Sequence, residues 1–181
     1  NTLDFAMVDA VVAASDALAR DNAIRVVVLA GAGKHFMAGG DVRTFHGTLS
    51  HPPAERHALL ENVVDRIHYA IETFHRLDVP VVARVQGAVA GFGLSMVCAC
   101  DLAIAADDAY FAAAYRQIGL SPDGGMSWSL PRLVGARRAA EILLLSERFD
   151  APAALAMGLV NRVVPVADLD AAVDKVVASI V

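Results

Sequence analysis

The sequence predicts an α/β fold in which parallel strands alternate with helices. Short runs rich in β-branched and small apolar residues at 25–30, 81–85 and 102–106 are typical of buried strands, because branched side chains pack well on a covered, pleated surface. Segments with helical periodicity separate these runs. This alternation implies parallel pairing in βαβ or ββα units.

Composition narrows the class of protein. A chain of 181 residues is long enough for one domain with a sizeable core. Hydrophobic residues make up 56% and charged residues 19%, so we expect burial against other subunits as well as inside the chain. The net charge of −5 and the lack of a basic run argue against a nucleic-acid partner.

The apolar run at residues 81–101 is expected to be a core segment and not a membrane span. Arg84, Gln86 and Asp101 leave an uninterrupted apolar stretch shorter than the ~20 residues that a span needs. The chain opens without an initiator Met or a signal peptide and ends in an apolar helix, so we expect a segment of a longer cytoplasmic protein. Cys98 and Cys100 face different directions, which predicts free buried thiols.

The first half of the chain reads as helices and strands joined by glycine turns. Apolar spacing predicts the helices, and Pro80 closes the long one. In order, we expect a helix at 3–20, a strand at 25–30, a glycine turn at 35–41, a short helix at 42–45, a surface loop at 46–53 and a long amphipathic helix at 54–77.

The stretch at residues 81–101 organises the rest. A strand at 81–85 turns through Gly87, Gly91 and Gly93 into a helix at 94–100 that is apolar all round. The first N–H groups of such a helix lack partners and point above the turn, where they could hold an oxygen that becomes negative. The glycines could instead serve only close packing.

The second half continues the alternation. Expected are strands at 102–106 and 110–112, a connector at 115–120, a turn at 121–125, helices at 126–134, 136–145 and 151–157, a strand at 162–164 and a final helix at 166–181.

Three separated motifs in this order resemble the enoyl-CoA hydratase/isomerase (crotonase) family: residues 36–41, 86–101 and 119–135. The resemblance implies a crotonase-like spiral of ββα units, an acyl-CoA thioester substrate with no cofactor beyond its coenzyme A, and a homotrimer or dimer of trimers. Residues 1–181 would be a single core domain that lacks part of the N-terminal hairpin and the C-terminal trimerisation helices.

The resemblance also implies an oxyanion hole made by the N–H groups of Ala38 and Phe92. Two fixed donors of this kind are each worth about 3 kcal/mol for a developing enolate. Phe92 stands where the family usually has glycine. Lys34 or Arg43 could meet a phosphate of coenzyme A or remain unpartnered. The residues implied to bind substrate or coenzyme A are Ala38, Gly39, Gly40, Asp41, Val42, Gly91 and Ser95.

The catalytic carboxyl implied by the resemblance is Asp123. The two glutamates of the family's hydratases are replaced by Ser95 and Tyr115, which disfavours ordinary hydration. An aspartate matching Asp123 occurs in the phenylacetyl-CoA epoxide isomerase, in dienoyl-CoA isomerases and in aromatic acyl-CoA dehalogenases. Isomerases use it to move a proton, whereas dehalogenases use it as a nucleophile with a histidine from the long helix. His57 is near that histidine's position without matching it.

Structural readings compete with each of these roles. Pro-Asp-Gly is a common turn, so Asp123 could simply cap it, and Tyr115 could simply pack. A helix N-terminus would lower the pKa of Asp123 and apolar burial would raise it. Ser95 does not stand in a G-x-S-x-G elbow. One face of the long helix carries three side chains at a spacing compatible with metal binding: His68, Glu72 and His75. We expect no metal there.

We therefore expect an acyl-CoA isomerase with Asp123 as proton shuttle, closest in motif to the phenylacetyl-CoA epoxide isomerase-like members. The alternatives are a hydratase-type lyase and a non-catalytic acyl-CoA-binding protein.

Overall fold

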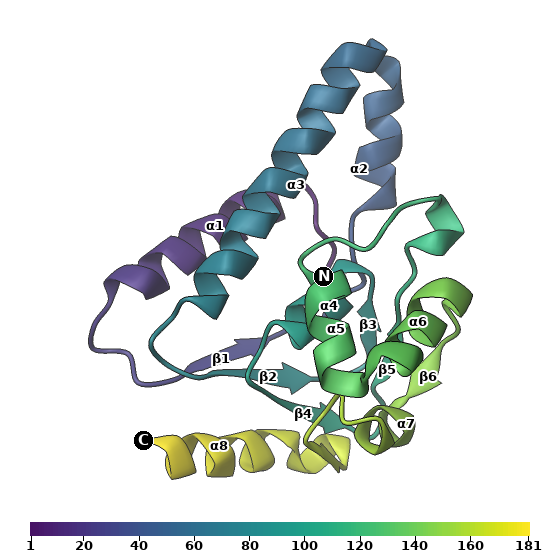
Figure 1. Cartoon of the computed structure of the whole chain (residues 1–181). Coiled ribbons are helices and arrows are strands. Elements are labelled where there is room, and N and C mark those ends of the chain that lie inside the picture. Colours follow the sequence, from purple (N-terminus) through teal and green to yellow (C-terminus); the bar gives the residue numbers. More distant parts are fainter.

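A computed structural model describes all residues 1–181, and its helices pack around two small sheets (Figure 1). The helices are α1 (Phe5–Arg20), α2 (Val42–Gly47), α3 (Pro53–His75), α4 (Phe92–Cys98), α5 (Met126–Val134), α6 (Ala136–Leu145), α7 (Ala151–Ala156) and α8 (Leu169–Ile180), with short 3₁₀ turns at Thr48–Ser50, Arg116–Ile118 and Val166–Asp168. The strands are β1 (Val27–Ala30), β2 (Val81–Val85), β3 (Ala88–Ala90), β4 (Leu102–Ala106), β5 (Tyr110–Ala112), β6 (Phe149–Asp150) and β7 (Arg162–Val164).

The larger sheet is entirely parallel, as the alternation of strands and helices predicts. Its order is β1-β2-β4-β7. The smaller sheet has the order β3-β5-β6, in which β3 and β5 are parallel and β6 is antiparallel. Strands therefore come in pairs, β2 with β3 and β4 with β5, that divide between the two sheets, and the expected α/β fold of ββα units is confirmed.

Side chains alternate between two apolar clusters on either side of the larger sheet. Val82 and Ile104 face α8 in a small cluster completed by Leu169. Ala83 and Ala105 face the main core, which includes α4. This alternation is the period of two that a strand imposes, and it leaves α8 alone on the outer face of the sheet (Figure 1).

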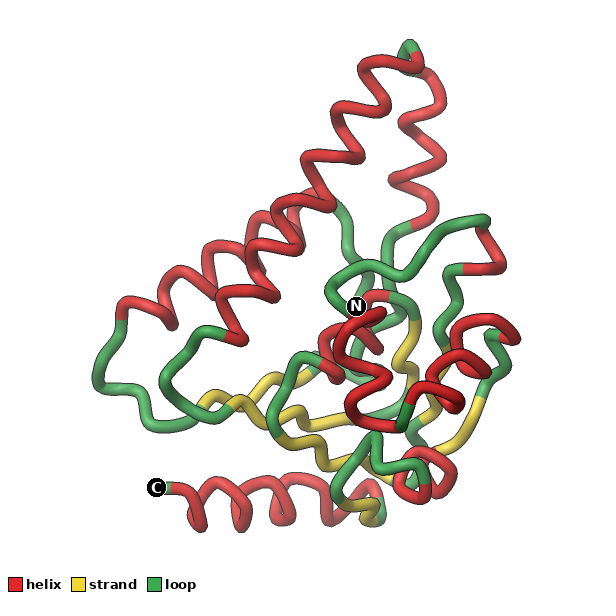
Figure 2. The backbone as a smooth tube through the Cα atoms, viewed as in Figure 1, coloured by secondary structure: helices red, strands yellow, loops and turns green.

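Helices α1 and α3 lie side by side beyond the sheets, and α3 and α2 project from the body of the molecule (Figure 2). The buried residues of α3 follow a helical stripe that includes Ile67 and Ile71. A salt bridge from Arg66 to Asp9 and a hydrogen bond from the Tyr69 hydroxyl to Asp16 join the two helices at their rims.

The structure corrects several expected boundaries. Residues 46–53 were expected as a loop, but α2 continues to Gly47 and a 3₁₀ turn follows at Thr48–Ser50, so that only residues 51–52 precede α3. Strand β3 lies inside the stretch expected as a glycine turn, and β6 was not expected at all. The first helix begins at Phe5 because Asp4 caps it and Leu3 pairs with Gly40.

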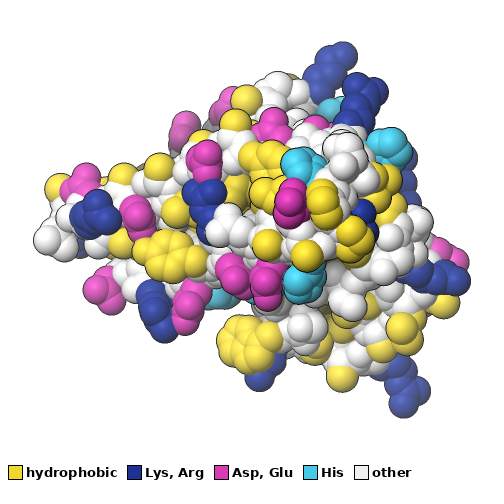
Figure 3. Space-filling view, turned by 90° about the horizontal axis from the view of Figure 1, so that it is seen from above, with side chains coloured by type: hydrophobic (Ala, Val, Ile, Leu, Met, Phe, Trp, Pro, Cys, Tyr) yellow, Lys and Arg dark blue, Asp and Glu magenta, His cyan; other side chains and the backbone are white.

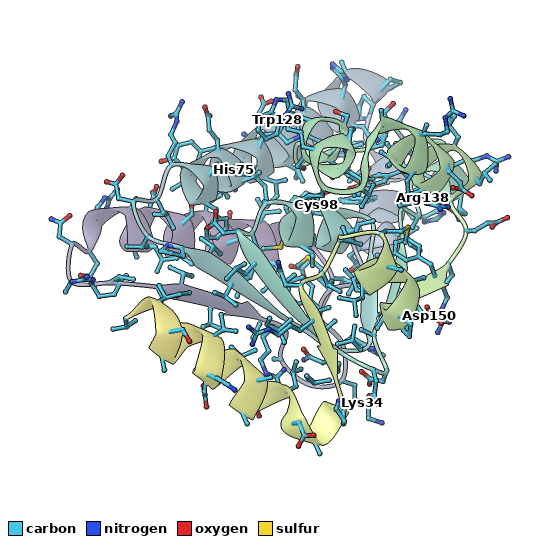
Figure 4. All side chains as sticks on the ribbon, turned by 60° about the horizontal axis from the view of Figure 1, so that its bottom comes forward. Lys34, His75, Cys98, Trp128, Arg138 and Asp150 are labelled. Carbon is cyan, nitrogen blue, oxygen red and sulfur yellow. The ribbon has the colours of Figure 1, made fainter.

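No helix combines the length and the apolar character needed to cross a membrane. Cys98 and Cys100 are free, as expected. Cys98 is 4% exposed, and Figure 4 shows it in the middle of the molecule among the packed helices. Burial raises the pKa of each thiol to about 12, so both stay protonated and apolar at neutral pH.

Candidate active site

Three side chains that the sequence analysis singled out meet in one hydrogen-bonded cluster. The Tyr115 hydroxyl donates to Asp123 Oδ1 at 2.5 Å. Ser95 Oγ lies 3.0 Å from the Tyr115 hydroxyl and also 3.0 Å from the Asp123 carbonyl oxygen, to which it donates. Ser95 and Tyr115, the residues expected at the positions of the hydratase glutamates, therefore both contact Asp123.

Each member of this cluster comes from a different element. Ser95 is in the buried helix α4, Tyr115 precedes the 3₁₀ turn after β5, and Asp123 lies in the turn before α5. Gly124 makes the contact between the elements possible, since a Cβ there would lie 2.8 Å from the Ser95 Cβ and 2.9 Å from the Phe92 ring. The buried Phe92 ring packs against this glycine in the core.

The pKa of Asp123 is raised above its ordinary value because burial disfavours the carboxylate. The hydrogen bond from Tyr115 and the nearby His68 act in the opposite direction without outweighing burial. Burial and the charge of Asp123 likewise raise the pKa of the Tyr115 hydroxyl. Asp123 is thus a carboxyl that takes up a proton more readily than an exposed aspartate.

A histidine of the long helix also reaches this cluster, and it is His68. Its Nε2 accepts a hydrogen bond from the Gly124 N–H at 3.0 Å. His57, considered from the sequence, is exposed and lies 3.9 Å from Glu61 on the outer part of α3. The signal for His68 was its position directly after buried Ile67, on the edge of the helix stripe that faces the core.

The two glycine turns lie directly against each other. Gly39 adopts φ +90° and a Cβ there would meet the Ala90 carbonyl at 3.0 Å, while one on Gly91 would meet the Gly39 Cα at 3.6 Å. Gly93 is packed still more tightly, because a Cβ there would lie 2.3 Å from the Met37 carbonyl oxygen. This contact brings the turn after β1 beside the first turn of α4.

One of the two expected main-chain donors forms a hydrogen bond within the chain. The Ala38 N–H donates to the Asn1 carbonyl oxygen at 2.9 Å, so this expected donor is already occupied. Gly40, two residues later, uses its N–H in no hydrogen bond within the chain. Phe92 is the first residue of α4, and the first N–H groups of a helix have no partner inside it.

The residues expected to meet coenzyme A are only partly exposed, since Gly39, Gly91 and Ser95 are buried. Val42 and Ala38 are exposed, whereas the Asp41 side chain caps α2 by accepting from the Arg43 N–H at 3.0 Å and from the Thr44 hydroxyl at 2.9 Å. These bonds lower the pKa of Asp41. Lys34 is exposed at the side of the molecule opposite Trp128 (Figure 4).

The side chains on the face of α3 that carries His68, Glu72 and His75 each contact a different partner. Glu72 pairs with Arg76, and the His75 ring meets the Trp128 ring edge-on with centroids 6.1 Å apart. His75 and Trp128 are neighbours in Figure 4. No group of three or more His, Cys, Asp or Glu side chains is placed to hold a metal ion.

The family model described as enoyl-CoA hydratase/isomerase matches residues 1–181. The chain belongs to this family. Solved structures of enoyl-CoA hydratases also resemble this chain in fold. The enoyl-CoA hydratase of Mycobacterium smegmatis has a TM-score of 0.88 and 36% identity over 99% of this chain and 67% of that one.

Curated relatives within the family carry different reactions in their names. The 4-chlorobenzoyl coenzyme A dehalogenase-1 of Arthrobacter sp is 35% identical over 88% of this chain and 56% of its own length. The human mitochondrial Delta(3,5)-Delta(2,4)-dienoyl-CoA isomerase is 33% identical over 82% of this chain and 47% of its own. The chain spans about half the length of the curated relatives that it matches.

Proposed function

We propose that this family member is an acyl-CoA isomerase in which Asp123 moves a proton beside a thioester-stabilised enolate. The observation that carries the proposal is that Tyr115 donates to the Asp123 carboxyl and Ser95 to the Asp123 carbonyl oxygen. Both residues stand where the resemblance places the two hydratase glutamates. With no carboxylate at either hydratase position, water addition lacks its usual base.

The proposed reaction needs one base that later acts as an acid. The Asp123 carboxylate takes a proton from a carbon of the acyl chain, and the electron pair of that C–H bond becomes part of the enolate. The neutral carboxyl then returns the proton further along the chain, which shifts the double bond. Its raised pKa favours the protonated intermediate state.

We assign the stabilisation of the enolate oxygen to main-chain amides on the two adjoining glycine turns. The Phe92 N–H is one donor. Because the Ala38 N–H is bound to Asn1, we propose the free N–H of Gly40 as the second. Such donors act as fixed dipoles aimed at the place where negative charge develops, and each contributes about 3 kcal/mol.

Asp123→Asn tests the proposal against a panel of 2-enoyl-, 3-enoyl- and 3,5-dienoyl-CoA esters, followed by the absorbance of the conjugated thioester. We expect turnover to fall about 10²- to 10⁴-fold, while Asp65→Asn on the exposed side of α3 stays at the wild-type rate. Unchanged turnover in Asp123→Asn would remove Asp123 from the mechanism. Water addition to crotonyl-CoA would favour the hydratase alternative, and coenzyme A binding without turnover the non-catalytic one.

A second candidate function is hydrolytic dehalogenation of an aromatic acyl-CoA. It is favoured by His68, which comes from the long helix and lies against Gly124 beside Asp123, and by the 35% identity to the Arthrobacter dehalogenase. The carboxylate would add to the ring carbon that bears the halogen, halide would leave, and water deprotonated by His68 would hydrolyse the resulting ester.

Chloride release from 4-chlorobenzoyl-CoA separates the two candidates. A dehalogenase would release one chloride per ester consumed, and His68→Gln would accumulate the aryl ester on Asp123, visible as a mass increase of the intact chain. An isomerase would release none.

We also propose a cytoplasmic homotrimer or dimer of trimers. Large apolar side chains stay exposed on α5 and α6, with Trp128 57% and Leu144 69% exposed, and exposed apolar surface is typical of an unfilled interface. Hydrophobic groups are also exposed among charged ones on the face seen in Figure 3. Light scattering of the purified protein gives the oligomeric mass directly.

A further inference from the structure

The segment that carries Tyr115 is clamped by a serine outside the cluster already described. Strands β5 and β6 pair in antiparallel register, with Phe111 opposite Phe149. Continuing that register by three residues brings Ala114 opposite Ser146. At this point the main-chain hydrogen bonds between the strands end. The Ala114 N–H instead donates to a side chain, Ser146 Oγ, at 3.0 Å.

Both residues adopt a backbone conformation that is unfavourable for a side chain with a Cβ. Ala114 has φ +62° and Ser146 has φ +56°, and they are the two residues other than glycine with positive φ in the chain. Left-handed conformations of this kind persist where the surroundings determine them, and they gather at functional sites. Here the two are hydrogen-bonded to each other.

Gln117 closes the clamp on the other side of Tyr115. Ser146 Oγ donates to Gln117 Oε1 at 3.0 Å, and Gln117 Nε2 donates to the Ser146 carbonyl oxygen at 3.1 Å. Ser146 is 5% exposed and ends helix α6. Tyr115 is thus bracketed by residues 114 and 117, which are both fixed to one buried serine.

We propose that Ser146 is a positioning residue that fixes Tyr115 and, through it, the Asp123 carboxyl. The hydroxyl accepts one hydrogen bond and donates another, so it holds the backbone before Tyr115 and the side chain after it at the same time. The Tyr115 ring then leaves the segment in one direction, toward Asp123 Oδ1. The functional part of this inference rests on the proposed role of Asp123.

Ser146→Gly is the decisive variant, because glycine adopts the left-handed conformation without strain and the change removes the CH2OH group that carries the bonding hydroxyl. Ser50→Gly removes an exposed hydroxyl at the end of another helical turn and is the matched control. The readout is the proton NMR resonance of the 2.5 Å Tyr115–Asp123 hydrogen bond, which is expected far downfield for so short a bond and is assigned by its loss in Tyr115→Phe.

We expect Ser146→Gly to lose or broaden this resonance while its Tm stays near the wild-type value, and Gln117→Ala to weaken the resonance in the same direction. With an active acyl-CoA ester, kcat should fall about 10- to 100-fold, as for a misplaced catalytic group, and KM should stay the same. If Ser146→Gly does not fold, Gln117→Ala carries the test.

An unchanged resonance in folded Ser146→Gly, or no such resonance in the wild type, would overturn the inference. Loss of the resonance in Ser146→Gly, with no turnover of any ester by the wild type, would support the clamp and at the same time reject the proposed function. The two proposals therefore fail separately.

Discussion

The proposed chemistry depends on one carboxyl, that of Asp123, and two opposing influences set its pKa. Burial raises its pKa, while the hydrogen bond from Tyr115 is the strongest influence that lowers it. Tyr115 itself stays protonated, since burial and Asp123 raise its own pKa. The pair therefore consists of a permanent donor and a carboxyl that titrates above its ordinary range.

Tyr115→Phe should raise the pKa of Asp123 further, because it removes the hydrogen bond that favours the carboxylate. A base loses activity as the pH falls through its pKa, so the acidic limb of the kcat/KM profile should move to higher pH. The profile over pH 4 to 9 is the measurement. Tyr69→Phe, which removes an exposed hydroxyl between α1 and α3, should leave the limb in place; movement of the limb to lower pH in Tyr115→Phe would contradict the assignment.

Asp123→Asn should stabilise the folded protein at neutral pH. Because the folded pKa is raised, the folded state holds a proton that the unfolded state has lost. The stability from Asp123 is fully present below its ordinary pKa of 3.8 and is lost as the pH rises through the raised value. Urea unfolding between pH 4 and 8 should show a gain in Asp123→Asn that grows with pH. A gain independent of pH would speak against this.

At the scale of the elements, the two turns that contain Gly39 and Gly91 determine whether their main-chain amides can lie close together. The turn that contains Gly39 and the start of α4 touch backbone to backbone, without intervening side chains. Strand β3 holds the two turns together through a parallel β-bridge between Met37 and Val89. The site thus depends on the absence of side chains at these positions as much as on the groups that are present.

Gly93→Ala should destabilise the protein by about 1 to 3 kcal/mol, the usual effect of overpacking. Its Cβ would lie 2.3 Å from the Met37 carbonyl oxygen and would push the two turns apart. Gly47→Ala is the matched control, since it has helical φ and no neighbour within 4 Å, and it should gain about 0.4 to 1 kcal/mol. Denaturant midpoints compare the two. Equal midpoints would mean that the turns do not pack as described.

The whole molecule separates a structural face of the larger sheet from the face that carries the site. Helix α8 covers the outer face through its own small cluster, and Asp170 pairs with Arg84 of β2 at 2.5 Å. Helix α4 with Ser95 belongs to the main core on the inner face. A change under α8 is therefore expected to act on stability and not on the chemistry.

Leu169→Ala should cost about 2 to 5 kcal/mol of unfolding free energy, since it empties a fully buried position at the start of α8, against the larger sheet. Val166→Ala, at a residue 51% exposed just before α8, should stay within about 0.5 kcal/mol of the wild type. Below its lowered Tm, the Leu169 variant should keep the pH profile of the wild type. A shifted profile would mean that the outer face is coupled to the site.

The sequence alone predicted the alternation of strands and helices, because side-chain periodicity and the backbone limits of proline and glycine act within a few residues of each other. It also singled out Asp123, Tyr115 and Ser95, through motifs that are local stretches of chain. Only the tertiary structure decided that these three meet, that His68 and not His57 reaches them, and that Asn1 occupies the Ala38 amide.

Long-range contacts also explain why β3 and β6 were not predicted and why the sequence did not determine the pKa of Asp123. Strand β6 has two residues, too few for a period to be visible, and β3 lies between glycines that indicate a turn. Both are strands because β5 pairs with them. The pKa of Asp123 depends on how deeply distant segments bury it. Contacts between residues far apart in the chain set these properties, and no pattern of neighbouring residues encodes them.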